Sequence, residues 1–404
     1  MNPNIKKLYP YPFERLAGLL AGIKPDLALN RIALSLGEPK HAPPQFVLDE
    51  LVRSLPEAAG IYPVALGIEP LRTACADWFG RRFGVDLDPA TEVLPVGGSR
   101  EGLFSIAQAT IDASRKNPTV LMPNPCYQIY EGGALLAGAL PYYMNTDATN
   151  DFVPDLDAVP DTVWSDCQLI YVCSPGNPTG VVLDSQFYEE LIDLADRHDF
   201  LIVADECYCE LYRTTPPVSL LEICKALGRE TFDRCIVFHS LSKRSSLPGL
   251  RSGFVAGDGV RLREYLKYRT YHGCAMSEII QRASVVAWNE DSHAAANRDL
   301  YNRKYDAVAP ILGEVWDMDI PPAAFYLWPQ ASADDEDFVR DLYAATNVIA
   351  LPGSYLSRKA HGSNPGAGYL RLSLVAPIAD CVTAARRIRD FVKQQNQPEL
   401  RKRS

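Results

Sequence analysis

The chain has 404 residues, of which 47% are hydrophobic and 22% are charged, so it can bury a large core and does not have the composition of a disordered protein. Two domains are expected at this length. A formal net charge of −10 and a pI near 5.2 exclude general binding to nucleic acid or to acidic membranes, which requires a positive surface. The single basic cluster, Arg401-Lys402-Arg403, is interpreted as a solvated tail.

Ten scattered cysteines are predicted to be reduced thiols, because the chain is large and begins without a hydrophobic secretion signal. No stretch approaches the length of a membrane span. We therefore expect a cytoplasmic protein.

The middle of the chain alternates between two kinds of element. Runs rich in Val and Ile predict buried strands at 119–122, 169–173, 200–204, 235–239 and 253–256. Helical spacing of apolar residues is found at 101–116 and 185–198. This alternation indicates a mainly parallel sheet covered by helices.

After residue 287 the pattern changes to predicted helices at 297–312, 335–346 and 379–394, which indicates a smaller α+β unit. The Pro-rich first forty or so residues are expected to pack on that unit or on a partner subunit. We predict an N-terminal segment at 1–45, a large domain at 46–287 and a small domain at 288–404.

A lysine in the segment 240–253 has the setting of a group that binds an aldehyde cofactor covalently. Lys243 lies between two predicted strands, flanked by small hydroxyl side chains and followed eight positions later by Arg251. Lys243 can form an imine, while Ser240, Ser242 and Arg251 can hold a phosphate. A serine-rich surface loop is the alternative, but the whole spaced set favours the cofactor.

This segment resembles the active-lysine signature of class I and II aminotransferases, which have the aspartate aminotransferase fold. The similarity continues at matching positions from Gly37 to Arg371. The resemblance implies an α/β fold with a large, mainly parallel α/β/α domain and a smaller α+β domain. It also implies that pyridoxal 5'-phosphate is bound through Lys243, and that no metal is needed.

Two further segments that end predicted strands match the family. By resemblance, Asn177 in the turn-rich loop 174–180 donates to the phenolic oxygen of the cofactor and lies near the substrate, and Tyr208 donates to the same oxygen. Asp205 ends a strand, and a carboxylate beside the pyridine nitrogen keeps that nitrogen protonated. Cys207 and Cys209 form a C-x-C pair without further ligands, so packing is favoured over metal binding.

The phosphate cup is expected to be completed by Gly98, Ser99 and Arg100, which come just before a predicted helix whose N-terminal amides favour an anion. A plain turn is the alternative reading. The resemblance implies that Tyr127 stacks on the pyridine ring. Arg100 departs from the Thr or Gly that is frequent at its position, and is a candidate for substrate recognition.

Three residues far apart in the chain are expected to complete the site. Arg371 lies among apolar residues, and the resemblance implies that it binds the substrate α-carboxylate, with a buried salt bridge as the alternative. Gly37 is expected to line the same pocket. By resemblance, Tyr62 reaches the cofactor phosphate of the neighbouring subunit, which implies a homodimer with shared active sites; a half-buried loop tyrosine is the alternative. His239 and His272 are interpreted as structural.

A closer resemblance is to bacterial succinyldiaminopimelate transaminases of lysine and diaminopimelate biosynthesis. It is carried by segments along the whole chain, at 2–4, 8–13, 37–41, 238–245, 268–276 and 351–357. The implied reaction converts N-succinyl-L,L-2,6-diaminopimelate and 2-oxoglutarate into N-succinyl-2-amino-6-oxopimelate and glutamate. Lys40, Arg100 and Arg269 are the candidates for binding the additional carboxylates.

Other activities are open. The alternatives are another class I aminotransferase, acting on aspartate, aromatic amino acids or N-acetylornithine, and a pyridoxal-phosphate-dependent lyase or decarboxylase. A regulator that fuses this fold to a DNA-binding domain is disfavoured, because no winged-helix segment precedes the region of resemblance.

Overall fold

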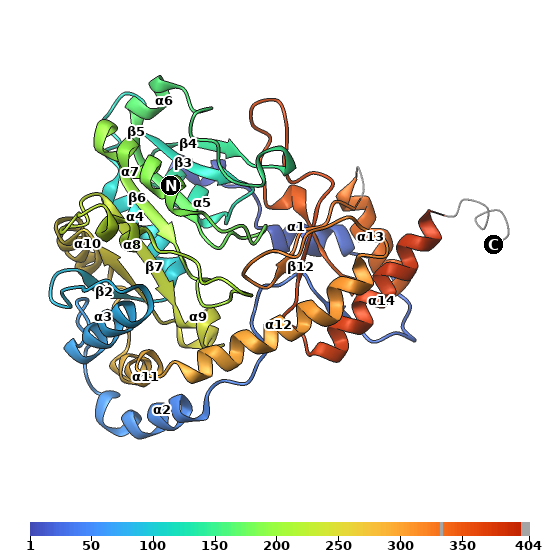
Figure 1. Cartoon of the computed structure of the whole chain (residues 1–404), viewed down its shortest axis with the longest axis horizontal. Coiled ribbons are helices and arrows are strands. Elements are labelled where there is room, and N and C mark those ends of the chain that lie inside the picture. The colour runs from blue at the N-terminus through green and yellow to red at the C-terminus, as the bar shows by residue number, and fades with distance from the viewer. Residues whose placement is uncertain (332–333, 397–404) are drawn as a thin grey trace.

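The computed structural model describes residues 1–331 and 334–396. Its larger part is built around a seven-stranded sheet (Figure 1). The strand order is β2-β8-β7-β6-β5-β3-β4; β8 is antiparallel to both neighbours, and all other adjacent pairs are parallel. The predicted mainly parallel sheet is therefore confirmed. The strands are β2 (Val93–Val96), β3 (Thr119–Asn124), β4 (Leu140–Asn145), β5 (Cys167–Cys173), β6 (Leu201–Asp205), β7 (Cys235–Ser240) and β8 (Gly253–Gly257).

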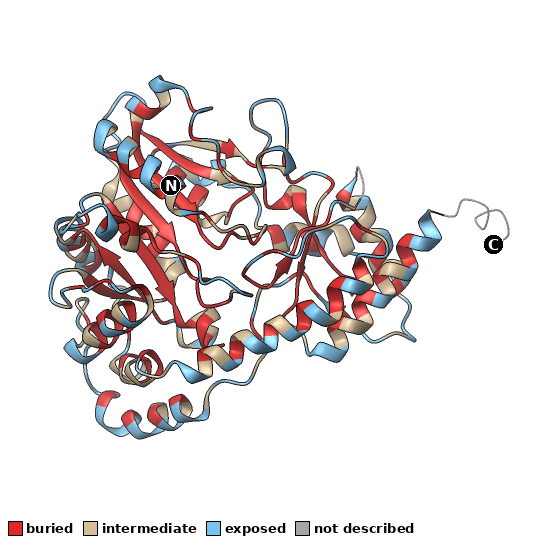
Figure 2. Ribbon diagram, viewed as in Figure 1, coloured by how far each residue is buried: buried red, intermediate tan, exposed pale blue. Residues whose placement is uncertain are grey.

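Helices cover both faces of this sheet because its central strands are apolar on both sides. In β5, Ile170 and Val172 belong to one core, whereas Leu169 and Tyr171 belong to the other, as the period of two in a strand requires. The central strands β5, β6 and β7 are buried along their whole length, whereas the edge strand β4 is partly exposed (Figure 2). The first core includes α2 (Gln45–Ala58), α3 (Glu69–Phe83), α6 (Asp161–Asp166), α7 (Ser185–His198), α8 (Leu220–Ala226) and α11 (Glu278–Trp288). The second includes α4 (Ser99–Thr110), α5 (Ile129–Leu136) and α10 (Gly259–His272).

A separate hydrophobic core surrounds a small antiparallel sheet with the order β11-β12-β9. The first residues of the chain join it, because Leu16 is buried there and β1 pairs in parallel with β10. We propose that the two parts are the two domains expected from the sequence, divided near residue 287. The elements are α1 (Pro12–Leu20), β1 (Ile32–Ala33), α12 (Ser292–Leu312), β9 (Tyr326–Leu327), α13 (Asp335–Thr346), β10 (Val348–Ile349), β11 (Leu351–Pro352), β12 (Leu370–Ser373) and α14 (Ile378–Gln395).

α12 joins the two parts physically. It begins beside α9 (Leu241–Arg244), at the edge of the large sheet, and its later residues pack against α14 (Figure 1). The short 3-10 helices are η1 (Pro3–Lys7), η2 (Ala148–Asn150), η3 (Pro248–Leu250) and η4 (Gly353–Tyr355).

Most predicted helices are confirmed, with small shifts at their ends. The helices at 185–198 and 335–346 have the predicted limits, 379–394 extends by one residue at each end, and 297–312 begins five residues earlier. The prediction of a helix to residue 116 was wrong, since α4 ends at Thr110. Asp112 ends the helical region, because its backbone N–H donates to Gln168 and its carboxylate accepts from Ser114 in a tight turn.

No helix in the two described ranges is long and apolar enough to cross a membrane. All ten cysteines are free thiols, as predicted, and nine of them are buried. The basic cluster at 401–403 lies outside the described residues.

Candidate active site

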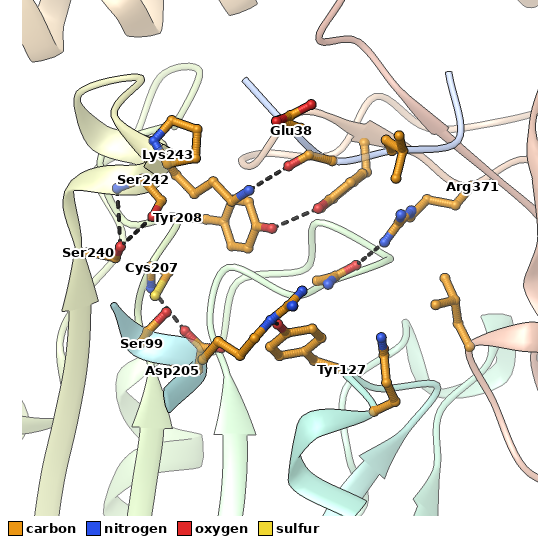
Figure 3. A pocket seen from close by; sticks show the side chains of 18 of the residues that line it. Glu38, Ser99, Tyr127, Asp205, Cys207, Tyr208, Ser240, Ser242, Lys243 and Arg371 are labelled. Carbon is orange, nitrogen blue, oxygen red and sulfur yellow. Dashed lines mark hydrogen bonds between the residues drawn. The ribbon is translucent and has the colours of Figure 1, made fainter. Parts of the chain in front are cut away.

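Side chains from several strand ends meet at one edge of the large sheet. β2, β5, β6 and β7 point in the same direction, so the residues that follow them come together at their carboxyl ends. A cavity of about 560 Å³ opens there (Figure 3). Its lining includes most of the predicted site residues: Gly37, Ser99, Arg100, Tyr127, Asn177, Asp205, Tyr208, Ser240, Ser242, Lys243, Arg251 and Arg371.

The amine of Lys243 points into this cavity from a four-residue helix, α9, which directly follows β7. Ser240 begins the helix, and its hydroxyl accepts from the backbone N–H of Ser242 at 3.1 Å. The Lys243 amine donates to the carbonyl oxygen of Gly37. Because the surrounding protein removes water from the ammonium form, the pKa of Lys243 is lowered to about 8.

Tyr326 leaves no room for a side chain at position 37, where the residue is Gly37. A Cβ atom at Gly37 would lie 2.4 Å from the hydroxyl oxygen of Tyr326. Gly37 thus lines the pocket, as expected, and its lack of a side chain also allows Tyr326 to approach it closely. Tyr326 also shares a hydrogen bond of 2.7 Å with the hydroxyl of Tyr208.

Asp205 is the last residue of β6, and only 4% of it is exposed. Its Oδ2 accepts from the hydroxyl of Tyr130 at 2.7 Å, and its Oδ1 accepts from the backbone N–H of Cys207 at 3.3 Å. Burial nevertheless raises the pKa of Asp205 above its ordinary value. A cationic group in the cavity would favour the ionised form of this carboxylate.

The neighbouring carboxylate of Glu206 faces away from the cavity. It is fully buried, lies 3.1 Å from Nε2 of His239, and accepts from the backbone N–H of Leu220 at 2.9 Å. Neither His239 nor His272 lines the cavity. Of this acidic pair, which stands at the end of β6, only Asp205 lines the cavity.

Hydrogen-bond donors form a cup for an anion at one end of the cavity. Ser99 is the first residue of α4, and Ser240, Ser242 and Arg251 line the same space. Gly98 does not line the cavity, but a Cβ atom there would come within 2.5 Å of the Arg251 guanidinium. Amides at a helix N-terminus, hydroxyls and a guanidinium are suitable phosphate ligands.

Arg371 in β12 is a buried cation whose contacts are neutral. Its guanidinium donates to Oδ1 of Asn177 at 2.9 Å and to the carbonyl oxygen of Ser35 at 2.7 Å. Only 4% of the residue is exposed, and Nε has no hydrogen-bond partner among the described residues. No ion pair with Arg371 is formed within these residues, which argues against the structural salt bridge and favours an anionic ligand.

Of the three cations considered for additional carboxylates, Arg100 alone lines the cavity. It donates to the hydroxyls of Tyr127, at 2.6 Å, and Tyr11, at 2.8 Å. Arg269 is fully buried and bound to Glu101 at 2.7 Å. Lys40 is exposed and pairs with Glu38 at 2.6 Å. The geometry therefore excludes Arg269 and disfavours Lys40.

Tyr62 lies outside the cavity of its own chain and is 98% exposed. Nine lining residues were not identified as site residues from the sequence: Tyr11, Phe13, Leu36, Glu38, Gln128, Cys207, Pro248, Tyr326 and Leu356. Cys207 was expected only to pack, and Tyr326 was not singled out. Tyr11 and Phe13 were signalled only by the resemblance of the segment 8–13.

These groups fit pyridoxal phosphate: an enclosed amine of lowered pKa, a buried carboxylate that favours a cation, a cup for an anion, and an unpaired arginine. Their placement at the carboxyl edge of the sheet is that of a pyridoxal-phosphate-dependent enzyme of the aspartate aminotransferase fold. Comparisons with known proteins extend this assignment.

The family model for aminotransferase class I and II matches residues 30–388. An LL-diaminopimelate aminotransferase of Desulforudis audaxviator is 32% identical over 394 residues, covering 95% of this chain and 96% of that protein. A crystal structure of an aminotransferase from Neisseria meningitidis is 44% identical, with a TM-score of 0.93 and coverage of 97% and 100%. A "probable N-succinyldiaminopimelate aminotransferase" from Thermus thermophilus is 26% identical, with a TM-score of 0.83 and coverage of 94% and 99%.

The chain therefore belongs to the class I and II aminotransferases. It is a pyridoxal-phosphate-dependent aminotransferase that acts on amino-acid and 2-oxo-acid substrates.

The pKa of Lys243 can be measured in the cofactor-free protein. We expect trace acetylation of Lys243 by acetic anhydride to rise with pH and to be half-maximal at about pH 8, because only the unprotonated amine reacts. Mass spectrometry of the peptide containing Lys243 would quantify the label against a free amine standard of known pKa. A midpoint near 10.5, the ordinary value for lysine, would contradict the desolvation of this amine.

Proposed function

We propose that this enzyme transfers the amino group of N-succinyl-L,L-2,6-diaminopimelate to 2-oxoglutarate. The observation that carries the proposal is that Arg100 and Arg371 both line the cavity without a carboxylate partner among the described residues. Two separate cations suit a donor that has carboxylates both at the reacting carbon and further away.

Each cavity residue has a role in this proposal. Pyridoxal phosphate supplies an aldehyde that takes up the amino group and a ring that accepts the electrons of the broken Cα–H bond. Lys243 would hold the cofactor, and its free amine would move the proton at Cα. Asp205 would keep the ring nitrogen protonated, whereas Asn177 and Tyr208 would donate to the phenolic oxygen.

The remaining residues bind and orient. Tyr127 would stack on the ring, and the phosphate would be held by the backbone of Gly98, Ser99 and Arg100, by the hydroxyls of Ser240 and Ser242, and by Arg251. Arg371 binds the α-carboxylate with two parallel hydrogen bonds, next to Gly37 and Asn177.

The role of Lys243 is tested by Lys243→Ala. We expect kcat/KM to fall by about 10⁴-fold or more, because the variant lacks the group that moves the proton. Lys304→Met is a matched control: Lys304 is another buried lysine with a pKa lowered to about 8, but it does not line the cavity. Steady-state kinetics on both variants would decide. Near-native turnover of Lys243→Ala would overturn the assignment.

We also propose a homodimer with shared active sites. The support is an exposed apolar stretch that includes Ile61, Tyr62 and Val64, of which Tyr62 is almost completely exposed. Exposed apolar groups that lie close together are typical of an interaction surface. In this proposal Tyr62 donates to the cofactor phosphate in the partner's cavity.

Subunit mixing tests the sharing of sites. Tyr62→Ala and Lys243→Ala chains should each be impaired alone, but a mixed dimer regains one site that has an intact Lys243 and an intact Tyr62. Random mixing by joint refolding should restore about one quarter of wild-type activity, because half of the dimers are mixed and each has one good site of two. No gain over the separate variants, measured by activity per chain, would mean that Tyr62 does not act across subunits.

LL-diaminopimelate is the second candidate donor, because relatives such as that of Desulforudis audaxviator are LL-diaminopimelate aminotransferases. The two donors differ in distal charge: the free diamine carries an ammonium, whereas the succinylated donor carries a neutral amide and a further carboxylate. The charged residues lining the cavity are Glu38, Arg100, Asp205, Lys243, Arg251 and Arg371. Glu38 is paired with Lys40, so the excess of cations favours the succinylated donor.

We expect the succinylated donor to have the highest kcat/KM when compared with LL-diaminopimelate, aspartate, tyrosine and N-acetylornithine. Arg100→Gln should lower that value by about 10- to 100-fold, since it removes a charge-assisted hydrogen bond to a distal carboxylate. Arg100→Lys is the control that keeps the charge. A higher kcat/KM for LL-diaminopimelate would leave the enzyme an aminotransferase but overturn the proposed donor.

A further inference from the structure

A side chain from another helix binds the carbonyl end of the helix that carries Lys243. Asn297 in α12 donates from Nδ2 to the carbonyl oxygens of Lys243, at 2.9 Å, and Arg244, at 3.1 Å. A helix of only four residues leaves its last carbonyl groups without donors of its own. Asn297 therefore acts as a C-terminal cap for α9, and only 6% of it is exposed.

The orientation of Asn297 is fixed by His41. Because Nδ2 of Asn297 faces two carbonyl oxygens, Oδ1 is the atom that lies 2.7 Å from Nδ1 of His41. An amide oxygen can only accept, so His41 donates from Nδ1. Burial lowers the pKa of His41, which favours the neutral ring with the proton on Nδ1. The ring also packs on Tyr301, with centroids 4.4 Å apart.

His41 belongs to the segment that also contacts the tip of the lysine. Gly37, four residues earlier, accepts from the Lys243 amine, and the carbonyl oxygen of His41 accepts from the hydroxyl of Ser246 at 2.8 Å. One N-terminal segment thus contacts the amine directly and holds the lysine backbone through Asn297. Loss of the cap would leave two carbonyls unpaired and free α9 to shift.

We propose that Asn297, oriented by His41, is a positioning residue that places the Lys243 amine for bonding to the cofactor aldehyde. This inference rests on the proposed role of Lys243. The inference predicts different effects on the binding of two forms of the cofactor. Pyridoxal phosphate bonds to the lysine, whereas pyridoxamine phosphate has the same ring and phosphate but no aldehyde, so only the first depends on where the amine lies.

The test compares the Kd values of the full-length protein for these two compounds. Asn297→Leu should raise the Kd for pyridoxal phosphate by about tenfold, as expected for two lost hydrogen bonds to the helix, and leave that for pyridoxamine phosphate within about twofold. His41→Phe, which keeps a ring against Tyr301 but cannot donate, should show the same selective loss. His41→Gln, whose amide can donate to Asn297, should be close to wild type.

Asn302→Leu is the matched control, because Asn302 lies on the same helix and binds the carbonyl oxygen of Tyr212 at 3.2 Å. It should change neither Kd. If Asn297→Leu raises the Kd values for both compounds equally, or raises neither, the inference is overturned. Lys243→Ala distinguishes failure of the proposed role of Lys243 from failure of the positioning role of Asn297. If Lys243→Ala still binds pyridoxal phosphate in preference to pyridoxamine phosphate, the proposed role of Lys243 fails. If Lys243→Ala loses that preference but Asn297→Leu keeps it, only the positioning role fails.

Discussion

The buried carboxylate of Asp205 is the constraint around which the rest of the site is arranged. A carboxylate that is 4% exposed is costly unless it is hydrogen-bonded and faces a cation. Tyr130 and the backbone of Cys207 supply the hydrogen bonds, and Tyr130 is held by stacking on Tyr171 with centroids 4.6 Å apart. The position at which a cationic ring can bind is thereby set by rigid elements of the large sheet and its helices.

The groups around that position come from neighbouring strand ends and from the smaller core. Asp205 and Lys243 follow adjacent strands, β6 and β7, so their separation is fixed by the sheet. Arg371 and Tyr326 come instead from the small antiparallel sheet, and Gly37 comes from the N-terminal segment. The residues predicted to bind the cofactor thus lie mainly on the large sheet, whereas the buried arginine is contributed by the other core.

The sequence predicted those parts of the site that follow strands directly in the chain. Lys243 and Asp205 could be placed together because a buried strand ends beside each of them, and the gathering of strand ends is a property of parallel sheets. Asn177 also follows a strand, but its role was assigned by the resemblance to the family. Tyr326 and Asn297 could not be found in this way, because their contacts join residues that are far apart in sequence. Arg269 could not be excluded either, since its ion pair with Glu101 depends on how α10 and α4 pack.

Four arginines differ in whether a carboxylate balances their charge, and this difference affects the free energy of folding. Arg269 and Arg358 are bound to Glu101 and Glu131, so their charges are balanced within the protein. Within the described residues, Arg100 and Arg371 instead donate to hydroxyl, amide and carbonyl oxygens, which leave the positive charge uncompensated. Gathering such cations in one cavity opposes folding, because they repel each other and because Arg371, which is buried, has lost water. Anionic ligands relieve that cost when they bind, so the arrangement proposed to select substrates with several carboxylates would also couple their binding to the stability of the folded enzyme.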